Sequence, residues 1–330
     1  MVDVALQDAS MIAAAGTARA RVLNRLRSGD VLFHGLTRAA AILVLLLLSG
    51  VIVSLISGSM PAFSRYGFTF LVSQAWNPVT DEYGALPAIY GTLITSFIAM
   101  LIAVPVGVMI AFFLTELCPQ WLRRPIGIAI ELLAGIPSII YGIWGLFVFA
   151  PFLQETLQPF LINTLGNVPG IGPAFGGPPY GIGMLTAGLI LAIMVLPFVT
   201  SISRDVFEAV PAVLKEAAYG LGCTTWEVVR NVVLPYARVG VIGGIMLSLG
   251  RALGETMAVT FVIGNAHHIS PSLLAPGTTI SATIANEFTE AVGDLYTSAL
   301  IALGLILFVI TFIVLAAARY MLLRIERRIG

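Results

Sequence analysis

The sequence predicts an all-α integral membrane protein with about six transmembrane helices. Of its 330 residues, 58% are hydrophobic and only 10% are charged, whereas charged residues make up roughly 25% of a typical soluble domain. The apolar residues come in long runs, and a helix needs about 20 apolar residues to cross a bilayer. So apolar a surface is incompatible with a chain that is free in water. The net charge of zero gives no basis for binding nucleic acid.

Six apolar runs define the expected helices in chain order. The first contains an unbroken aliphatic stretch from Ile42 to Leu48. It follows 37 other residues and precedes no small-residue cleavage site, so we interpret it as a retained anchor and not as a signal peptide. In the third run, Gly135 and Pro137 predict a kink. The expected spans are 38–58, 89–114, 126–150, 181–203, 238–263 and 297–319.

The basic residues predict the orientation of these spans. Fifteen of the 17 Lys and Arg residues lie in the two terminal tails or in the loops that fall on the same side as the tails. Arg65 would lie on the opposite side and Arg251 inside the fifth span. By the positive-inside rule, both termini are expected in the cytoplasm. We therefore expect a cytoplasmic basic tail at 1–37, a transmembrane domain at 38–320 and a second cytoplasmic basic tail at 321–330.

The expected cytoplasmic loop at 204–237 is polar but has helical spacing. Apolar residues recur at helical intervals over 205–221, and the pattern breaks at Gly222. Thr224 followed by Glu227 then predicts a new helix that begins with a capping box. Two short helices at a membrane face suit the docking of a partner protein. The alternative is an amphipathic helix that rests on lipid headgroups.

This loop resembles the EAA loop of ABC importer permeases. The family pattern is EAA, a glycine four residues later and a closing I-x-L-P, and this sequence departs from it only at Val232. The resemblance implies the ABC type I importer transmembrane fold, with its core at about 89–319. It also implies that the loop forms a coupling helix that inserts into a groove on a separate ATPase subunit. The residues that match the motif, and are expected to mediate this coupling, are Glu216, Ala217, Ala218, Gly222, Leu234 and Pro235.

The chain lacks the motifs of an enzyme. A Walker A loop needs Gly-Lys-Ser/Thr, but the sole lysine, Lys215, is flanked by leucine and glutamate. ATP and magnesium are therefore expected on the separate ATPase, with no cofactor in this chain. There is no HExxH motif. The adjacent His267 and His268 lie in an expected outer loop. We interpret them as ordinary loop residues and not as metal ligands.

Two further segments, at 131–142 and 250–260, resemble the PstC type of phosphate-specific transport permease, and the resemblance covers roughly residues 30–328. It implies import of inorganic phosphate across a bacterial inner membrane. The implied partners are a sister permease of the PstA type, an ATPase dimer and an extracytoplasmic phosphate-binding protein. A sulfate or molybdate permease of the same fold is the alternative. An ion-coupled carrier has less support, because the spans hold only two acids, Glu131 and Glu255.

The fifth span holds the expected substrate-pathway residues, Arg251 and Glu255. Intramembrane charges usually mark a pathway, and the planar guanidinium of arginine fits an oxyanion. We expect Arg251 to compensate the crossing anion and Glu255, one turn away at i+4, to compete for Arg251 and to accept the proton of hydrogen phosphate. The alternative is a purely structural Arg–Glu pair. Small residues at i+4 steps predict close packing of this helix, and they are Gly240, Gly244, Ser248 and Ala252.

Glu131, the other acid in the spans, has a different expected role. It lies about five residues into the third predicted span, which would begin on the cytoplasmic side. A carboxylate near a helix N-terminus is stabilised by the helix dipole. We therefore expect Glu131 to be structural.

Overall fold

The computed structural model describes the backbone of residues 2–326 and the side chains of residues 30 and 32–324. All of its long elements are helices, which confirms the predicted fold class. Within the described residues, six helical segments are long and apolar enough to cross a membrane. Much of the predicted tails at 1–37 and 321–330 lies outside the residues whose side chains are described. The six segments are Leu32–Tyr66, Leu86–Leu117, Ser138–Leu165, Met184–Glu208, Thr225–Leu253 and Asp294–Arg324.

The chain divides into two units, residues 1–57 and 58–330. The first unit belongs to a single long helix, α1 (Val2–Tyr66). Its aliphatic stretch is exposed, with 62% of both Leu45 and Leu47 accessible. An exposed row of leucine side chains on one helix suits a lipid environment.

The second unit begins with the last turns of α1, which pack on α15 (Asp294–Glu326). The Ala62 amide donates a hydrogen bond of 3.0 Å to the Ser298 hydroxyl, and Gly58 lies against Ile301. A short helix, α2 (Thr69–Val72), and a two-stranded antiparallel hairpin of β1 (Trp76–Asn77) and β2 (Glu82–Tyr83) follow. The segment 59–88, which joins the first two predicted spans, is thus largely built from regular elements.

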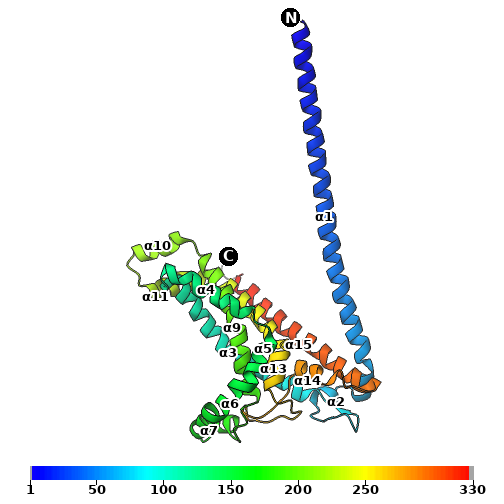
Figure 1. The fold of residues 1–330 in the computed structure, drawn as a ribbon, viewed down its shortest axis with the longest axis vertical. Coiled ribbons are helices and arrows are strands. Elements are labelled where there is room, and N and C mark those ends of the chain that lie inside the picture. Colours follow the sequence, from blue (N-terminus) through cyan, green and yellow to red (C-terminus); the bar gives the residue numbers. More distant parts are fainter. Residues whose placement is uncertain (1, 327–330) are drawn as a thin grey trace. The chain divides into compact units, whose positions relative to one another are not determined.

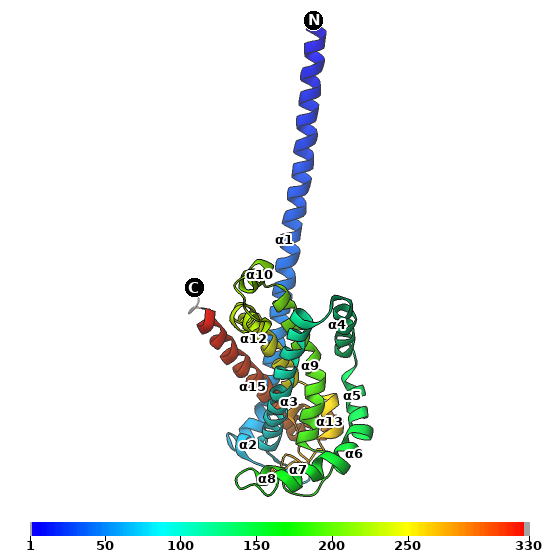
Figure 2. The same cartoon turned by 90° about the vertical axis from the view of Figure 1, so that its left-hand side faces the viewer.

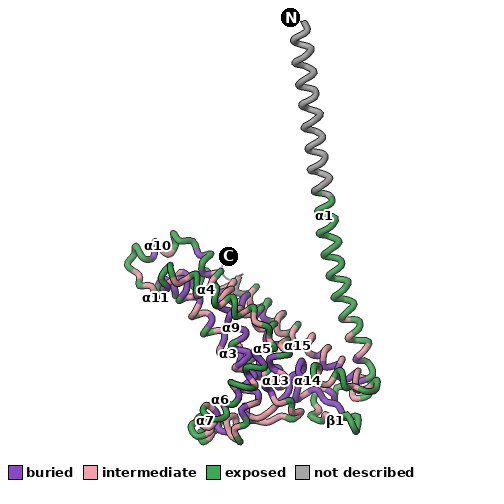
Figure 3. Tube along the Cα trace, viewed as in Figure 1, coloured by how far each residue is buried: buried purple, intermediate pink, exposed green. Residues whose placement is uncertain are grey.

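The core of the second unit lies between α3 (Leu86–Phe112) and α9 (Met184–Glu208), which run side by side with α12 (Leu234–Leu253) (Figures 1 and 2). Small residues permit this close approach, because a Cβ at Gly188 would lie 2.7 Å from Ile98 on α3. Figure 3 shows the buried residues concentrated along these helices. The largest buried side chains between them include Ile190 and Leu191.

The bounds predicted for the third span, 126–150, are wrong, because the helix is interrupted within them. Helix α4 (Gln120–Ala134) ends before Gly135, and α5 (Ser138–Trp144) begins after Pro137. Proline cannot continue a helix at this point because it lacks the amide hydrogen and its ring clashes with the preceding turn. The Tyr141 hydroxyl bridges the break by donating a 2.8 Å hydrogen bond to the Leu133 carbonyl.

The helical path then continues far beyond the predicted end of this span, so the candidate membrane segment is Ser138–Leu165. A π-helical turn, α6, a second π-helical turn and α7 carry it through much of 151–180, the loop between the third and fourth predicted spans. The rest of that loop is irregular apart from α8 (Gly172–Phe175), as its glycine and proline content predicts. The elements of this path are η2 (Gly145–Phe149), α6 (Ala150–Phe152), η3 (Leu153–Leu157) and α7 (Gln158–Leu165).

The remaining elements lie at the two ends of the bundle. At one end are α4, α10 (Ala212–Gly220) and α11 (Thr225–Val228), and at the opposite end are α2, α7 and α14 (Ile280–Glu287) (Figures 1 and 2). We call the first of these the α10 end and the second the α14 end. Three linking pieces complete the unit, namely η1 (Phe113–Leu117), η4 (Val229–Val233) and α13 (Met257–Val262).

Candidate functional site

The fifth predicted span, 238–263, is interrupted at its charged residues. Helix α12 ends at Leu253, and α13 begins only at Met257. Glycine is a poor helix former, and at Gly254 the last helical hydrogen bond, from its amide to the Gly250 carbonyl, is stretched to 3.4 Å. The expectation of one continuous helix through this region is therefore wrong.

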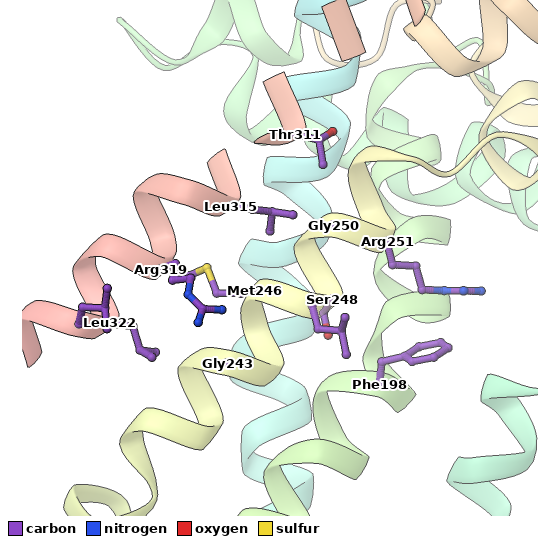
Figure 4. Close-up of a pocket in the computed structure, with 12 residues that line it drawn as sticks. Phe198, Gly243, Met246, Ser248, Gly250, Arg251, Thr311, Leu315, Arg319 and Leu322 are labelled. Atoms are coloured by element: carbon purple, nitrogen blue, oxygen red, sulfur yellow. The ribbon is translucent and has the colours of Figure 1, made fainter. Parts of the chain in front are cut away.

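Arg251 lies in the last turn of α12 and is exposed. A cation is stabilised there by the helix dipole. Its guanidinium lies 4.4 Å from the centre of the Phe198 ring on α9, at the distance of a cation–π contact. Figure 4 shows the side chain extending away from α15 towards this ring. No carboxylate of the described residues forms an ion pair with Arg251.

Glu255 is held by α13 and not by Arg251. Its carboxylate accepts a hydrogen bond of 3.3 Å from the Ala258 amide in the first turn of that helix. The predicted i+4 neighbour relation with Arg251 requires a continuous helix, which the break at Gly254 removes. Among the described residues, these two side chains form no ion pair. This corrects the expected geometry, while the role of each residue in a pathway remains a prediction.

A cavity of about 860 Å³ lies along α12, between α9 and α15. Its walls are mostly apolar, as at Met246, Leu247 and Leu315. Among the described residues, its polar lining includes two guanidinium groups, those of Arg251 and Arg319, and no acidic side chain. A cavity with positive groups and without a built-in counter-charge favours an anion.

The small residues of α12 allow it to pack on α9, as predicted. A Cβ at Gly240 would lie 2.6 Å from Val206, and a Cβ at Gly244 would lie 2.6 Å from Ile202. Ser248 and Ala252, one and two turns further along α12, are also buried. The stripe therefore fixes the helix that carries Arg251 against the core of the unit.

The loop at 204–237 forms the predicted pair of short helices at the α10 end (Figure 1). The helical pattern expected over 205–221 breaks at 209–211, because α9 ends at Glu208 and Pro211 precedes α10. Gly222 makes the turn between the helices with φ of +86°, a conformation that favours glycine. The capping box predicted for Thr224 and Glu227 is present at the start of α11.

Most of the motif residues are exposed, but one is buried against the helix bundle. Glu216 and Ala217 are exposed on α10, whereas Ala218 is 9% exposed and packs into the bundle. Leu234 and Pro235 open α12 and are both exposed. Around them lie further exposed apolar side chains, which mark a candidate protein-binding surface, namely Val213, Leu214, Leu221 and Trp226.

A short ion pair joins α10 to the bundle. The Lys215 ammonium lies 2.5 Å from the Glu116 carboxylate in η1, and the two side chains are 18% and 7% exposed. Lys215 also donates a 3.4 Å hydrogen bond to the Phe207 carbonyl near the end of α9. No local sequence pattern predicts this contact, because the two charges are 99 residues apart.

The dipole argument for Glu131 is wrong. The residue lies in the last turn of α4 and not near a helix N-terminus. Its carboxylate instead accepts a 2.7 Å hydrogen bond from the Arg204 guanidinium of α9. Arg204 also contacts Asp205 at 3.3 Å. Glu131 therefore joins two helices through an ion pair.

The α14 end is held together by a cluster of side chains around Glu287. Its carboxylate accepts hydrogen bonds of 2.7 Å from Trp76 and 2.6 Å from Tyr296, and its other oxygen lies 2.8 Å from the His267 ring. The rings of Trp76 and His267 stack 5.1 Å apart. The expectation that His267 is an ordinary loop residue is therefore incomplete, because its ring takes part in a cluster of side chains from four segments.

The environment of Glu287 also changes its acidity. Burial alone would raise its pKa, but the hydrogen bonds from His267, Tyr296 and Trp76 favour the charged form. Together they bring the pKa below its ordinary value. Nearby, burial and the Asp81 carboxylate raise the pKa of Tyr83 to about 12.

The chain is similar to known transport proteins over most of its length. A family model described as "Binding-protein-dependent transport system inner membrane component" matches residues 103–327. The "Phosphate transport system permease protein PstC" of Mesorhizobium japonicum is 68% identical over 99% of both chains. The protein of the same description from Pasteurella multocida is 60% identical over 91% of this chain and 94% of its own. "Phosphate transport system permease protein PstC 1" of Mycobacterium tuberculosis is 43% identical over 80% and 79%.

Solved structures show the same fold at low sequence identity. A chain of a bacterial alginate ABC transporter in complex with an alginate-bound periplasmic protein aligns with a TM-score of 0.60 and 18% identity, covering 90% of this chain and 95% of that one. A chain of the MetNI methionine ABC transporter, in an inward-facing conformation, aligns with a TM-score of 0.52 and 17% identity over 73% and 94%.

Proposed function

The chain belongs to the family of binding-protein-dependent transport system inner membrane components and, within it, to the PstC phosphate permeases, and from this premise we propose how it imports phosphate. It is the transmembrane permease subunit of an ATP-driven ABC importer for inorganic phosphate. It is a multi-pass membrane protein with six apolar helical segments. The observation that supports an anion pathway is the Arg251 guanidinium, which is exposed in a large cavity and forms no ion pair with a carboxylate of the described residues.

In this proposal Arg251 compensates the charge of phosphate as it passes α12. A monovalent or divalent anion in an apolar passage is costly to desolvate, and a planar guanidinium offsets that cost through paired hydrogen bonds. Glu255 is part of the same pathway. Because Gly254 separates it from Arg251, a movement of this glycine brings the carboxylate towards the guanidinium, where it competes with bound phosphate and releases it. Glu255 can also accept the proton of hydrogen phosphate.

The loop at 204–237 couples this pathway to the motor. The exposed parts of α10, with Glu216, Ala217 and Gly222, dock on a separate ATPase, while Ala218 faces the bundle. Leu234 and Pro235 connect the docked helices to α12, which carries Arg251. ATP and magnesium are bound by the ATPase dimer, and this chain is non-catalytic and binds no cofactor of its own.

The remaining assignments complete the assembly. The chain works with a sister permease of the PstA type and an extracytoplasmic phosphate-binding protein. It lies in a bacterial inner membrane with both termini, the α10 end and the tails at 1–37 and 321–330 in the cytoplasm. The transmembrane domain then spans 38–320, with the importer core at about 89–319. The names of the relatives favour phosphate over sulfate or molybdate.

Uptake of labelled phosphate by the reconstituted complex tests this function. The parent complex is expected to import phosphate in preference to sulfate and molybdate, and only with ATP. Arg251→Gln is expected to abolish uptake while the complex still assembles. Arg65→Gln, which removes an exposed cation outside the cavity, serves as the control and should leave uptake unchanged. Normal uptake by Arg251→Gln would refute the role of Arg251.

A double substitution separates transport from structure. A purely structural Arg251–Glu255 pair would be largely rescued when Arg251→Gln and Glu255→Gln are combined, because no unpaired charge remains. A transport residue is not rescued, because the anion still lacks its partner. We expect no uptake from the double variant.

A further inference from the structure

The Arg251 guanidinium lies over an aromatic ring and forms no hydrogen bond with the described residues. Its central carbon is 4.4 Å from the centre of the Phe198 ring. Both side chains line the cavity along α12 (Figure 4). The proposed pathway gives a role to this cation, but it gives none to the ring that the cation contacts.

The packing of α9 on α12 places this ring within reach of the end of α12. Gly244 of α12 lies against Ile202 of α9, and the two helices run in opposite directions (Figures 1 and 2). One turn further along each helix, Ser248 is therefore level with Phe198. Arg251 follows three residues later. Because side chains of a helix tilt towards its N-terminus, the side chain of Arg251 leans back towards the level of the ring.

An aromatic ring can hold a cation without occupying its hydrogen-bond donors. The negative face of the ring attracts the guanidinium, which carries five N–H donors. A carboxylate in the place of Phe198 would accept bonds from these donors and would compete with an arriving phosphate. The nearby Glu255 instead accepts its hydrogen bond, of 3.3 Å, from the Ala258 amide. The donors of Arg251 thus remain available for an oxyanion.

We propose that Phe198 is a positioning residue for phosphate transport, which holds the Arg251 guanidinium in the cavity with its donors free for the anion. This inference rests on the proposed function. An arginine side chain has many rotamers, and ordering it before the anion arrives lowers the entropic cost of binding. The ring also keeps water from one side of the guanidinium, and a charge that is less exposed to water attracts an anion more strongly.

Fluorination of the ring tests this role with little change in the shape of the side chain. Fluorine withdraws electrons from the ring and weakens the attraction of its face for a cation. Phe198 is replaced in the complete complex by phenylalanine with one, two or three ring fluorines, and uptake of labelled phosphate is measured. We expect uptake to fall with each fluorine and to be about fivefold lower with three, which corresponds to about 1 kcal/mol. Equal uptake across the series would overturn the proposal.

Phe149 provides the matched control for the fluorinated series. It is half-buried, as Phe198 is, and its described ring contacts are with Trp144 and Phe152 and not with a cation. The same three fluorines at Phe149 should leave uptake unchanged. An equal loss at the two positions would overturn the proposal, because fluorine would then act through packing and not through the cation.

Two ordinary substitutions keep the test valid if the fluorinated chains assemble poorly. Phe198→Tyr keeps an aromatic face and should retain most of the uptake. Phe198→Leu keeps an apolar side chain without that face and should lower uptake about fivefold. Equal uptake by these two variants would overturn the proposal. Failure of the proposed function is distinguishable, because the parent complex would then import no phosphate, or Arg251→Gln would import it normally.

Discussion

The ion pair between Lys215 and Glu116 is expected to hold the coupling helix in its docking position. The two charged atoms are 2.5 Å apart, and the side chains are only 18% and 7% exposed. The pair connects α10 to η1, the continuation of α3, and α3 packs on α9 in the core. Loss of either charge should therefore release α10 from the end of a central helix.

The expected magnitude follows from the burial of the two groups. Removing one partner of a buried ion pair costs about 3–5 kcal/mol, because it leaves the other charge unpaired. Water reaches the Lys215 side chain in part, so we expect a smaller cost of roughly 2–3 kcal/mol for Glu116→Gln or Lys215→Met. That range corresponds to a decrease of about 30- to 150-fold in the population with α10 in place. The double variant leaves no unpaired charge and should recover to within about 1 kcal/mol of the parent.

Co-purification of the ATPase with the variant permease measures this population. The single variants should recover little ATPase and show a lowered melting temperature of the complex in detergent, while the double variant should recover most of both. Arg230→Gln is a suitable control, because Arg230 is an exposed cation in η4 of the same loop and forms no ion pair among the described residues. Full recovery of the ATPase by Glu116→Gln would refute the reasoning. An equal loss in the single and double variants would also do so, since it would mean that packing and not charge holds α10.

Three further predictions follow from the described geometry. Gly222→Val should lower ATPase recovery and phosphate uptake, since φ of +86° costs a side chain about 1–2 kcal/mol; Gly220→Val, with equal space and no positive φ, should have less effect. The contacts of Glu287 stabilise the fold above its ordinary pKa of 4.5 and are lost as the pH falls through its lowered pKa, so the parent melting temperature should fall steeply in acid and that of Glu287→Gln should not. A membrane-impermeant thiol reagent should miss Cys223 in intact cells; strong labelling in sealed cells would reverse the proposed orientation.

The number and type of the spans could be predicted from the sequence because long apolar runs have one stable outcome in a bilayer. Their interruptions could not be predicted to the residue. Gly135 and Pro137 indicated a kink, but the helix ends there and the apolar path restarts beyond it. Hydropathy averages over a window and does not register a break of three residues. The charged residue Glu131 of α4 was therefore assigned to a membrane span that begins later.

Some features of the candidate sites could also be predicted from the sequence, and others could not. The loop at 204–237 was predictable because its motif, turn glycine and capping box are local in sequence, and local patterns determine local structure. The contacts of Lys215, Glu131 and Glu287 were not predictable, because each joins segments far apart in the chain. Trp76 and Glu287, for example, are separated by 211 residues. No spacing rule connects such residues before the helices are packed.

The break at Gly254 explains how one segment can both be fixed and change its contacts. The stripe from Gly240 to Ala252 holds α12 tightly on α9, so Arg251 at its end has a defined position. Beyond Gly254, Glu255 lies in the break before α13, and its carboxylate accepts a hydrogen bond from the Ala258 amide of that helix. A continuous helix would keep the two charges one turn apart, at the spacing of an i,i+4 ion pair. Because the helix is broken, the guanidinium forms no ion pair with a carboxylate of the described residues and lies on the Phe198 ring, and we expect a rotation at Gly254 to bring Glu255 towards it. In the proposed function, this interruption is what would let the affinity for an anion change when the loop at 204–237 moves α12.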